Sequence, residues 1–90
     1  MGVAPRAPEQ ARGFELVTRV GCHLCDVMEA ELRPLLADHG LSLGLRDVDQ
    51  DAVLLERYGE VVPVLLRYGR PVAKVRLEPG QALRLIRRRR

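Results

Sequence analysis

The first half of the chain combines a short strand-like segment with one long helical pattern. Residues 14–20, FELVTRV, are rich in apolar and β-branched side chains, and a glycine follows them, as expected for a β-strand and the turn after it. Between residues 22 and 39 apolar side chains recur at helical spacing, and Gly40 stands where helices commonly end. Pro34 lies inside this predicted helix, where it removes a hydrogen bond and clashes with the previous turn, so a kink or a break is expected there.

The central segment predicts a second strand and a short helix. Residues 41–48, LSLGLRDV, alternate leucine with small or polar side chains, which is typical of a strand. Residues 51–58, DAVLLERY, carry a helical pattern that Asp49 or Asp51 can cap at its start and that Gly59 can end. A second strand–helix unit is therefore expected after the first.

The last third of the chain predicts a β-hairpin and a final helix. Residues 61–77 are interpreted as two strands joined by a two-residue turn at Gly69-Arg70, because glycine in first position is typical of hairpin turns. Pro71 follows this turn, and proline in a strand favours the edge of a sheet. Pro79 suits the first turn of a helix, and the apolar pattern after it continues to Ile86.

In chain order the predicted elements are β-α-β-α-β-β-α, which defines the expected fold class. The first two strands, joined by a helix, should be parallel with a right-handed crossover, and the hairpin adds an antiparallel pair. The result is an α/β architecture with a four-stranded mixed sheet and helices on both faces. Ninety residues form one such domain. We expect a flexible leader over residues 1–13, the domain over 14–86 and a basic tail over 87–90.

The net charge of +3 comes from one end of the chain. Four of the fifteen Lys and Arg residues form the run from Arg87 to Arg90, and without it residues 1–86 hold eleven basic against twelve acidic side chains. A nucleic-acid binder spreads its basic charge over a face or a groove, and single-strand binders also stack bases on aromatic side chains. Phe14, Tyr58 and Tyr68 are the aromatic residues here. No nucleic-acid partner is expected, and the tail is interpreted as a solvated end.

The N-terminal segment favours a cytoplasmic protein. Residues 1–13, MGVAPRAPEQARG, lack the continuous apolar run of a secretory signal or a membrane span, so no membrane partner is expected. Without an export signal the expected compartment is reducing, and structural disulfides do not persist there. The two cysteines of the chain, Cys22 and Cys25, are therefore interpreted as catalytic or metal-binding.

The sequence VGCHLCD places these cysteines three residues apart at the start of the predicted long helix. Backbone N–H groups and the positive end of the helix dipole favour the thiolate of a cysteine there. The helix terminus contributes roughly 0.3–1 kcal/mol, whereas each pKa unit requires about 1.4 kcal/mol. Hydrogen bonds from the N–H groups of Leu24 and Cys25, and a cation such as Arg19, are needed to complete the shift. Cys22 is then the exposed attacking thiol, and Cys25 is the shielded one.

With GCHLCD at the start of a helix and VVPV before a hairpin, the chain resembles the glutaredoxin and thioredoxin family, and most of all small bacterial glutaredoxin-like proteins. The resemblance covers about residues 14–86 and implies a thioredoxin-like fold. It implies that Cys22 attacks a disulfide as the nucleophile and that Cys25 resolves the mixed disulfide. It also implies a cis peptide bond before Pro63, which faces the dithiol, and a backbone at Val62 that the substrate joins as an added strand.

Other side chains around the motif are candidates for binding and tuning. Arg19 stands three residues before Cys22, where glutaredoxins carry a basic residue. His23 and Leu24 replace the usual proline and aromatic residue of that family and are expected to contact the substrate; a charged His23 would favour the thiolate of Cys22. Asp26 is either an ordinary acid in the first turn of a helix or a carboxylate that disfavours the second thiolate.

The segment before the last helix departs from the glutaredoxin pattern. Glutaredoxins hold the γ-glutamyl carboxylate of glutathione on the backbone N–H groups of a Gly-Gly pair at this point, whereas this chain has LEPGQ. Glu78 would repel a carboxylate, and Pro79 has no N–H to donate. Glutathione is therefore possible but disfavoured as the reductant, with a dithiol protein as the other candidate, and no bound cofactor is expected.

The cysteine pair leaves several interpretations open. We favour a monomeric thiol–disulfide oxidoreductase that reduces protein or low-molecular-weight disulfides. The alternative is a binding module that ligates an iron–sulfur cluster or a soft metal between two chains, without turnover. Zinc within one chain is disfavoured, because a tetrahedral site needs four ligands and only His23 and His39 could join the cysteines. A third interpretation is an interaction domain with a vestigial dithiol or two buried structural thiols.

Overall fold

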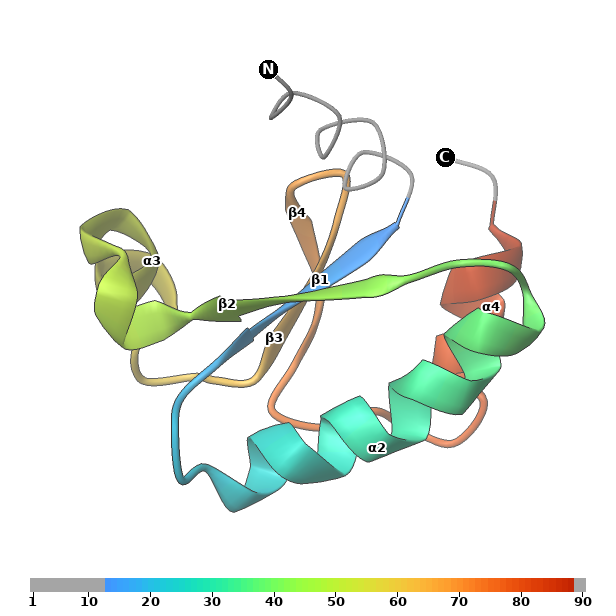
Figure 1. Cartoon of the computed structure of the whole chain (residues 1–90), viewed down its shortest axis with the longest axis horizontal. Coiled ribbons are helices and arrows are strands. Elements are labelled where there is room, and N and C mark those ends of the chain that lie inside the picture. Colours follow the sequence, from blue (N-terminus) through green and yellow to red (C-terminus); the bar gives the residue numbers. More distant parts are fainter. Residues whose placement is uncertain (1–12, 89–90) are drawn as a thin grey trace.

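A computed structural model of the chain describes residues 13–88, which form four strands, three α-helices and one short 3-10 helix (Figure 1). The predicted leader, apart from Gly13, and the last two residues of the predicted tail lie outside the described residues. In chain order the elements are β1 (Phe14–Thr18), α2 (His23–Asp38), β2 (Leu43–Asp47), η1 (Val48–Gln50), α3 (Ala52–Tyr58), β3 (Val64–Arg67), β4 (Arg70–Lys74) and α4 (Gln81–Arg87).

The strands form one mixed sheet in the order β2-β1-β3-β4. β1 pairs parallel with β2 and antiparallel with β3, and β4 pairs antiparallel with β3. Leu16 in the central strand lies opposite Leu45 on one side and Leu65 on the other. The predicted α/β class and the four-stranded mixed sheet are confirmed.

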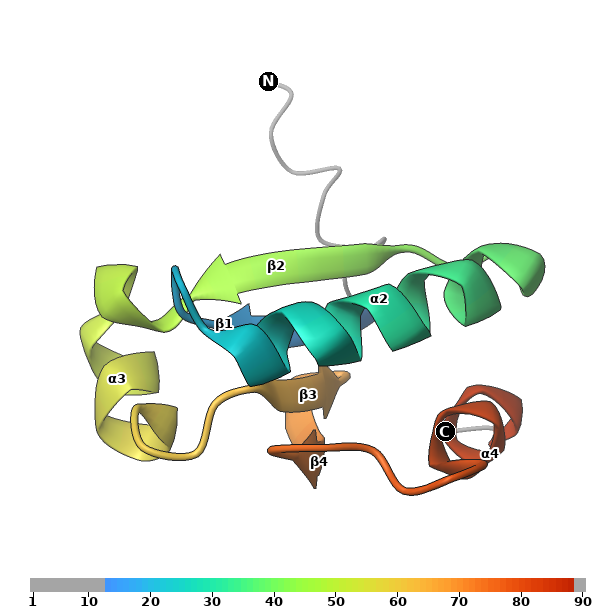
Figure 2. The same ribbon diagram turned by 90° about the horizontal axis from the view of Figure 1, so that it is seen from below.

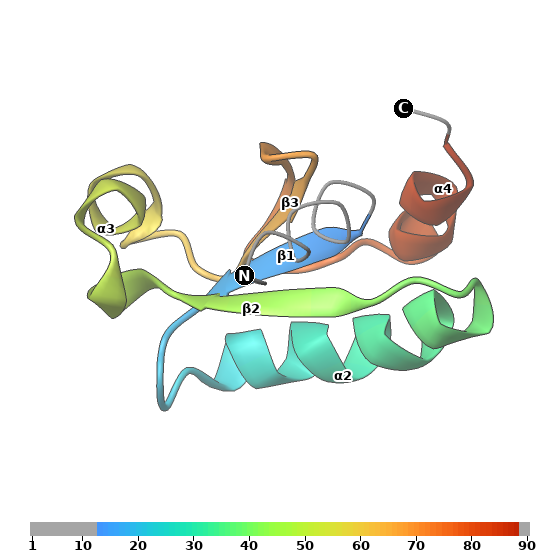
Figure 3. The same ribbon diagram turned by 45° about the horizontal axis from the view of Figure 1, so that its top comes forward.

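Helices cover both faces of the sheet because the side chains of β1 and β3 alternate between two cores. One core, on the face covered by α2 and α4, includes Phe14, Leu16 and Leu65. The other, on the face covered by α3, includes Val17 and Val64. Figure 2 shows α2 running along the sheet, and Figure 3 shows α3 beyond the end of β2. This arrangement brings the start of α2 and the end of α3 to the same end of the sheet.

The long helix is continuous through Pro34, so the predicted break does not occur. Pro34 and Ala30, whose carbonyl loses its helical partner, are both exposed, and water can solvate that carbonyl. The opposite side of α2 buries Met28, Leu32 and Leu36 against the sheet. This packing holds the helix straight enough to remain one element.

The hairpin turn differs from its prediction by one residue. Arg67 pairs with Arg70, so the turn residues are Tyr68 and Gly69, both with positive φ (53° and 79°), rather than Gly69-Arg70. Two positive φ values are the signature of a type I′ turn, which matches the twist of a hairpin. As predicted, the proline after the turn lies in an edge strand, β4.

The returning strand is also shorter than predicted, because it ends at Lys74. Val75 adopts a positive φ of 68°, which no regular strand allows. Its N–H donates to the carbonyl oxygen of Pro63 at 2.8 Å. The chain therefore leaves the sheet directly opposite the segment that precedes β3.

The last helix begins at Gln81, two residues later than predicted. Residues 78–81 form a type II turn instead, in which Pro79 holds the second position and Gly80 the third, with φ 79° and ψ −7°. The N–H of Gln81 closes this turn on the carbonyl oxygen of Glu78 at 2.9 Å. The helix then runs to Arg87, one residue into the predicted tail.

The other element boundaries shift by small amounts. β1 ends at Thr18 rather than at residue 20, and β2 covers five residues of the predicted 41–48 because Val48 begins η1. Asp51, rather than Asp49, caps α3, and Gly59 follows its end as predicted. Within residues 13–88, none of the helices has the length and apolarity that a bilayer span requires.

Candidate functional site

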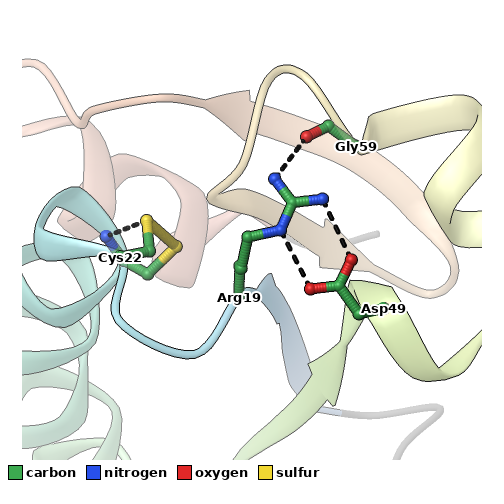
Figure 4. The surroundings of a disulfide bond; sticks show 5 residues. Arg19, Cys22, Asp49 and Gly59 are labelled. Atoms are coloured by element: carbon green, nitrogen blue, oxygen red, sulfur yellow. Dashed lines mark hydrogen bonds and ion pairs between the residues drawn. A yellow bond between two sulfur atoms is a disulfide. The ribbon is translucent and has the colours of Figure 1, made fainter.

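The two cysteines form a disulfide at the N-terminus of α2 (Figure 4). Their Cα atoms lie 5.2 Å apart, within the range usual for disulfides. Cys22 is the N-cap of the helix, and its Sγ accepts a hydrogen bond from the backbone N–H of Cys25 at 3.1 Å. The sulfur therefore occupies the position in which a side-chain oxygen usually caps a helix. In the reduced protein the same N–H and the helix dipole would stabilise a thiolate at Cys22.

The two sulfurs differ in their access to solvent. Cys22 is partly exposed, whereas Cys25 is 2% exposed and belongs to the buried residues of the domain. An incoming disulfide can reach only the sulfur of Cys22 without a rearrangement of the helix. This asymmetry matches the predicted division between an attacking and a shielded thiol.

The residues next to the cysteines in the chain include exposed apolar and polar side chains. Val20, two residues before the first cysteine, is 86% exposed, and Leu24 is 40% exposed. His23 and Asp26 are also exposed. The predicted substrate contacts His23 and Leu24 are therefore accessible, and Asp26 lies in the first turn of α2, as the sequence implied.

Pro63 lies at the same end of the sheet as the disulfide. β1 and β3 pair up to Val17 and Val64, so one position further along the pair places Pro63 beside Thr18, where the chain leaves the sheet toward the cysteines. The Val62–Pro63 peptide bond is cis, the isomer that the resemblance implied. Val62 precedes the first paired residue of β3, so its backbone lies outside the sheet ladder.

Arg19 makes contacts that the sequence did not predict. Its guanidinium donates to both carboxylate oxygens of Asp49, at 3.0 and 3.1 Å, and to the carbonyl oxygen of Gly59 at 2.9 Å. Figure 4 shows the guanidinium directed toward these two residues, on the side away from the sulfurs. The hydrogen bond between them holds the pKa of the Asp49 carboxyl below its usual range and raises the pKa of Arg19. Arg19 was expected as a cation near the thiolate, but the structure pairs it with Asp49.

Asp49 is the site residue that sequence reasoning missed, because it was considered only as a helix cap. β1 and β2 are parallel, so the residues just after their ends meet at one edge of the sheet. Arg19 follows β1 directly, and Asp49 lies two residues after the end of β2. The sequence feature that could have predicted this ion pair is the presence of opposite charges just after two strands expected to be parallel.

A metal site has little support within the described part of the chain. Among residues 13–88, no three or more His, Cys, Asp or Glu side chains gather in a way that could hold a metal ion. His39 lies at the far end of α2, where its Nδ1 is 2.9 Å from the carbonyl oxygen of Leu35. The cluster shared between two chains stays a prediction.

Comparisons with known proteins agree with this geometry. The model of the family described as glutaredoxin-like domain (DUF836) matches residues 14–86. Among solved structures, the X-ray structure of Fasciola hepatica thioredoxin is similar, with a TM-score of 0.60 and 16% sequence identity over 89% of this chain and 83% of that one. No curated protein matches the sequence. A close cysteine pair at a helix start in a thioredoxin-like fold supports a redox-type function.

Proposed function

Because the chain belongs to the glutaredoxin-like domain family, we propose that it is a thiol–disulfide oxidoreductase in which Cys22 attacks and Cys25 resolves. The observation that carries the proposal is the position of the two sulfurs. Cys22 caps α2 and is open to solvent, whereas Cys25 is buried one helical turn away and already within bonding distance. A thiolate stabilised by the helix start can therefore react outward first and be released by its neighbour afterwards.

The reaction exchanges one disulfide for another and needs no cofactor. The thiolate of Cys22 attacks one sulfur of the substrate disulfide, that bond breaks, and the leaving thiolate takes up a proton. Cys25 then loses its proton and attacks the Sγ of Cys22, which releases the second substrate thiol. Two electrons pass from the dithiol to the substrate, and the product is the Cys22–Cys25 disulfide that the structure contains. A separate thiol reductant must then restore the dithiol.

The surroundings of Cys22 favour a protein disulfide as the substrate. Val20 and Leu24, which precede and follow Cys22 in the chain, present exposed apolar side chains. The backbone of Val62, outside the sheet ladder, can pair with an extended segment of the substrate. An extended peptide with apolar side chains next to its cysteine satisfies both features, and an exposed His23 would lie at its edge.

The start of α4 favours a dithiol protein over glutathione as the reductant. The N–H of Glu78 donates to Oε1 of Gln81 at 2.8 Å, and the N–H of Gln81 donates to the carbonyl oxygen of Glu78. Pro79, between them, has no N–H. Three of the four positions from Glu78 to Gln81 thus offer no free N–H to a carboxylate, and the exposed side chain of Glu78 adds a negative charge. The γ-glutamyl carboxylate would find few donors and an unfavourable field there.

Two matched substitutions test the proposed function. Cys22→Ser should lower the rate of protein disulfide reduction by at least about 1000-fold, because the nucleophile is lost. Cys25→Ser should accumulate a mixed disulfide between substrate and Cys22, identified by mass spectrometry of the trapped peptide. Circular dichroism of both variants checks that the fold is intact. Equal activity of Cys22→Ser and the parent protein, or a mixed disulfide that accumulates at Cys25 in Cys22→Ser, would refute the assignment.

A further inference from the structure

The contacts of Arg19 point to a residue that regulates the same dithiol. We propose that Asp49 is a positioning residue that holds the guanidinium of Arg19 away from Cys22 and so limits the fraction of Cys22 present as thiolate. The inference rests on the proposed function, because a thiolate fraction matters only if Cys22 reacts as the nucleophile. It concerns the reduced protein, in which this sulfur carries the charge.

The geometry gives Arg19 a complete set of partners other than the cysteine. Both carboxylate oxygens of Asp49 accept from one edge of the planar guanidinium, and Gly59 accepts from the remaining nitrogen. Such a two-point contact fixes orientation as well as distance. The guanidinium cannot turn toward Cys22 without giving up both bonds to the carboxylate. Figure 4 shows the side chain stretched between the two acceptors.

The backbone of the same residue nevertheless lies next to the dithiol. The N–H of Cys22 donates to the carbonyl oxygen of Arg19 at 3.2 Å. An arginine side chain at position 19 is long enough to approach either the sulfur of Cys22 or the end of β2. The choice between the two directions is therefore set by Asp49 and not by the reach of Arg19.

Charge neutralisation supports the same conclusion. The ion pair leaves little net field from Arg19 at the sulfur, since the positive group and its carboxylate lie 3.0 Å apart. Side-chain exposures of 36% for Arg19 and 47% for Asp49 mean that water screens what remains. With Asp49 uncharged, Arg19 would add its field to that of the helix start, and the thiolate would gain stability.

The Gly59 contact gives the pair a second role. Gly59 ends α3 and begins the segment that leads to Val62 and Pro63. Arg19 thus joins the loop before the cysteines to the segment around Val62, whose backbone we propose pairs with the substrate. Loss of either partner should loosen this link, which would appear in stability rather than in the acidity of the thiol.

A four-member cycle of variants tests the proposal in the reduced protein. Every member carries Cys25→Ser so that one thiol titrates, and thiolate is measured by ultraviolet absorbance against pH. His23 and Asp26 beside the cysteine are the same in all members. Arg19→Gln alone leaves the charge of the Asp49 carboxylate unpaired, so the pKa of Cys22 should rise slightly above the parent value. Asp49→Asn should lower that pKa by about 0.5, and the double variant should return it to the parent value.

Two outcomes would overturn the proposal. If the double variant raises the pKa of Cys22 above the parent value by about 0.5 or more, Arg19 serves the thiolate directly. If Asp49→Asn changes only the melting temperature, Asp49 is structural. Asp49→Glu should keep the parent pKa, and Asp38→Asn, the same change at the far end of α2, should have no effect. Because titration does not depend on turnover, a protein that fails to reduce disulfides but passes this cycle would disprove only the proposed function.

Discussion

Two helices of this protein, α2 and α4, lie on the same face of the sheet. Their N-termini differ in the backbone N–H groups that they offer to an anion. α2 begins with Cys22, whose sulfur takes the place of a capping oxygen and accepts the N–H of Cys25. α4 begins after Gly80, which offers no side-chain cap, and the amides just before it are closed by Gln81 or missing at Pro79. In the proposed function, one start would stabilise the thiolate of Cys22, and the other would offer few N–H groups to an anion from outside.

If the proposed function is correct, this difference would allow a glutaredoxin-like domain to keep its dithiol chemistry with a different reductant. The chemistry depends on the start of α2, which needs only a cysteine and the backbone that follows it. Recognition of a carboxylate would depend on the start of α4, and in residues 78–81 most of the backbone N–H groups are hydrogen-bonded or, at Pro79, missing. Two short segments on one face of the domain therefore carry separate parts of the function.

The largest expected effect concerns the choice of reductant. At equal thiol concentration, glutathione should restore the oxidised protein about tenfold more slowly than a reduced thioredoxin, because a lost carboxylate contact of about 1.4 kcal/mol corresponds to that factor. The measurement is the rate at which the free thiols of the two cysteines reappear. Equal rates with both reductants would remove the proposed difference between the two helix starts.

A double substitution at the start of α4 tests the same comparison by making this helix start more favourable to a carboxylate. Glu78→Gln with Pro79→Ala removes one negative charge and restores one N–H, which should raise the rate with glutathione about two- to fivefold. The rate with reduced thioredoxin should not change, since the start of α2 is untouched. Pro34→Ala, which replaces an exposed proline within α2, serves as the control. An unchanged glutathione rate would show that the turn is not what excludes the carboxylate.

The start of α3 is a third case for comparison, because a carboxylate caps this helix. Its substitution has the smallest effect that we predict. The side chain of Asp51 accepts from the N–H groups of Val53 and Leu54. The bond from Leu54 above all holds the pKa of the Asp51 carboxyl below its usual range. Its contribution to stability is therefore complete above the unfolded pKa of about 3.9 and is lost as the pH falls through the lower folded value.

Asp51→Asn should accordingly flatten the acid dependence of stability. We expect the melting temperature to drop by about 3 °C near neutral pH and to fall less steeply than that of the parent protein below about pH 4. Thermal melts followed by circular dichroism over a pH series provide the measurement, with Asp38→Asn at the end of α2 as the control. A parallel loss of stability in parent and variant would contradict a charged cap at this helix.

Local sequence patterns predicted most of the fold because they determine each element separately. The helical spacing after Cys22, the proline at the sheet edge and the glycine after α3 each act over a few residues. At two places a local pattern fits two different structures, and there the prediction was wrong. Pro79 can open a helix or hold the second position of a turn, and the glycine after it decided for the turn. At the hairpin, Gly69 can hold the first or the second position of a two-residue turn, and it takes the second, after Tyr68, where both residues have positive φ.

The cysteines were also predictable, whereas the ion pair beside them was not. A C-x-x-C motif at a helix start is a pattern within one segment, and both residues lie where the sequence implied. Arg19 and Asp49 are thirty residues apart, and only the parallel pairing of β1 and β2 brings them together. Contacts that depend on topology have no local signal, and here one of them redirected a residue expected to serve the thiolate.

The pH dependence of alkylation of the reduced parent protein tests the role of the α2 start most directly. Iodoacetamide reacts with thiolates, and mass spectrometry of the product identifies which cysteine reacted. Alkylation should occur first at Cys22, with an apparent pKa about one below the value of about 8.5 for a free thiol, because the N–H of Cys25 and the helix start both favour the charge. Alkylation first at Cys25, or at Cys22 with a pKa of about 8.5 or higher, would contradict a nucleophile stabilised by the start of α2.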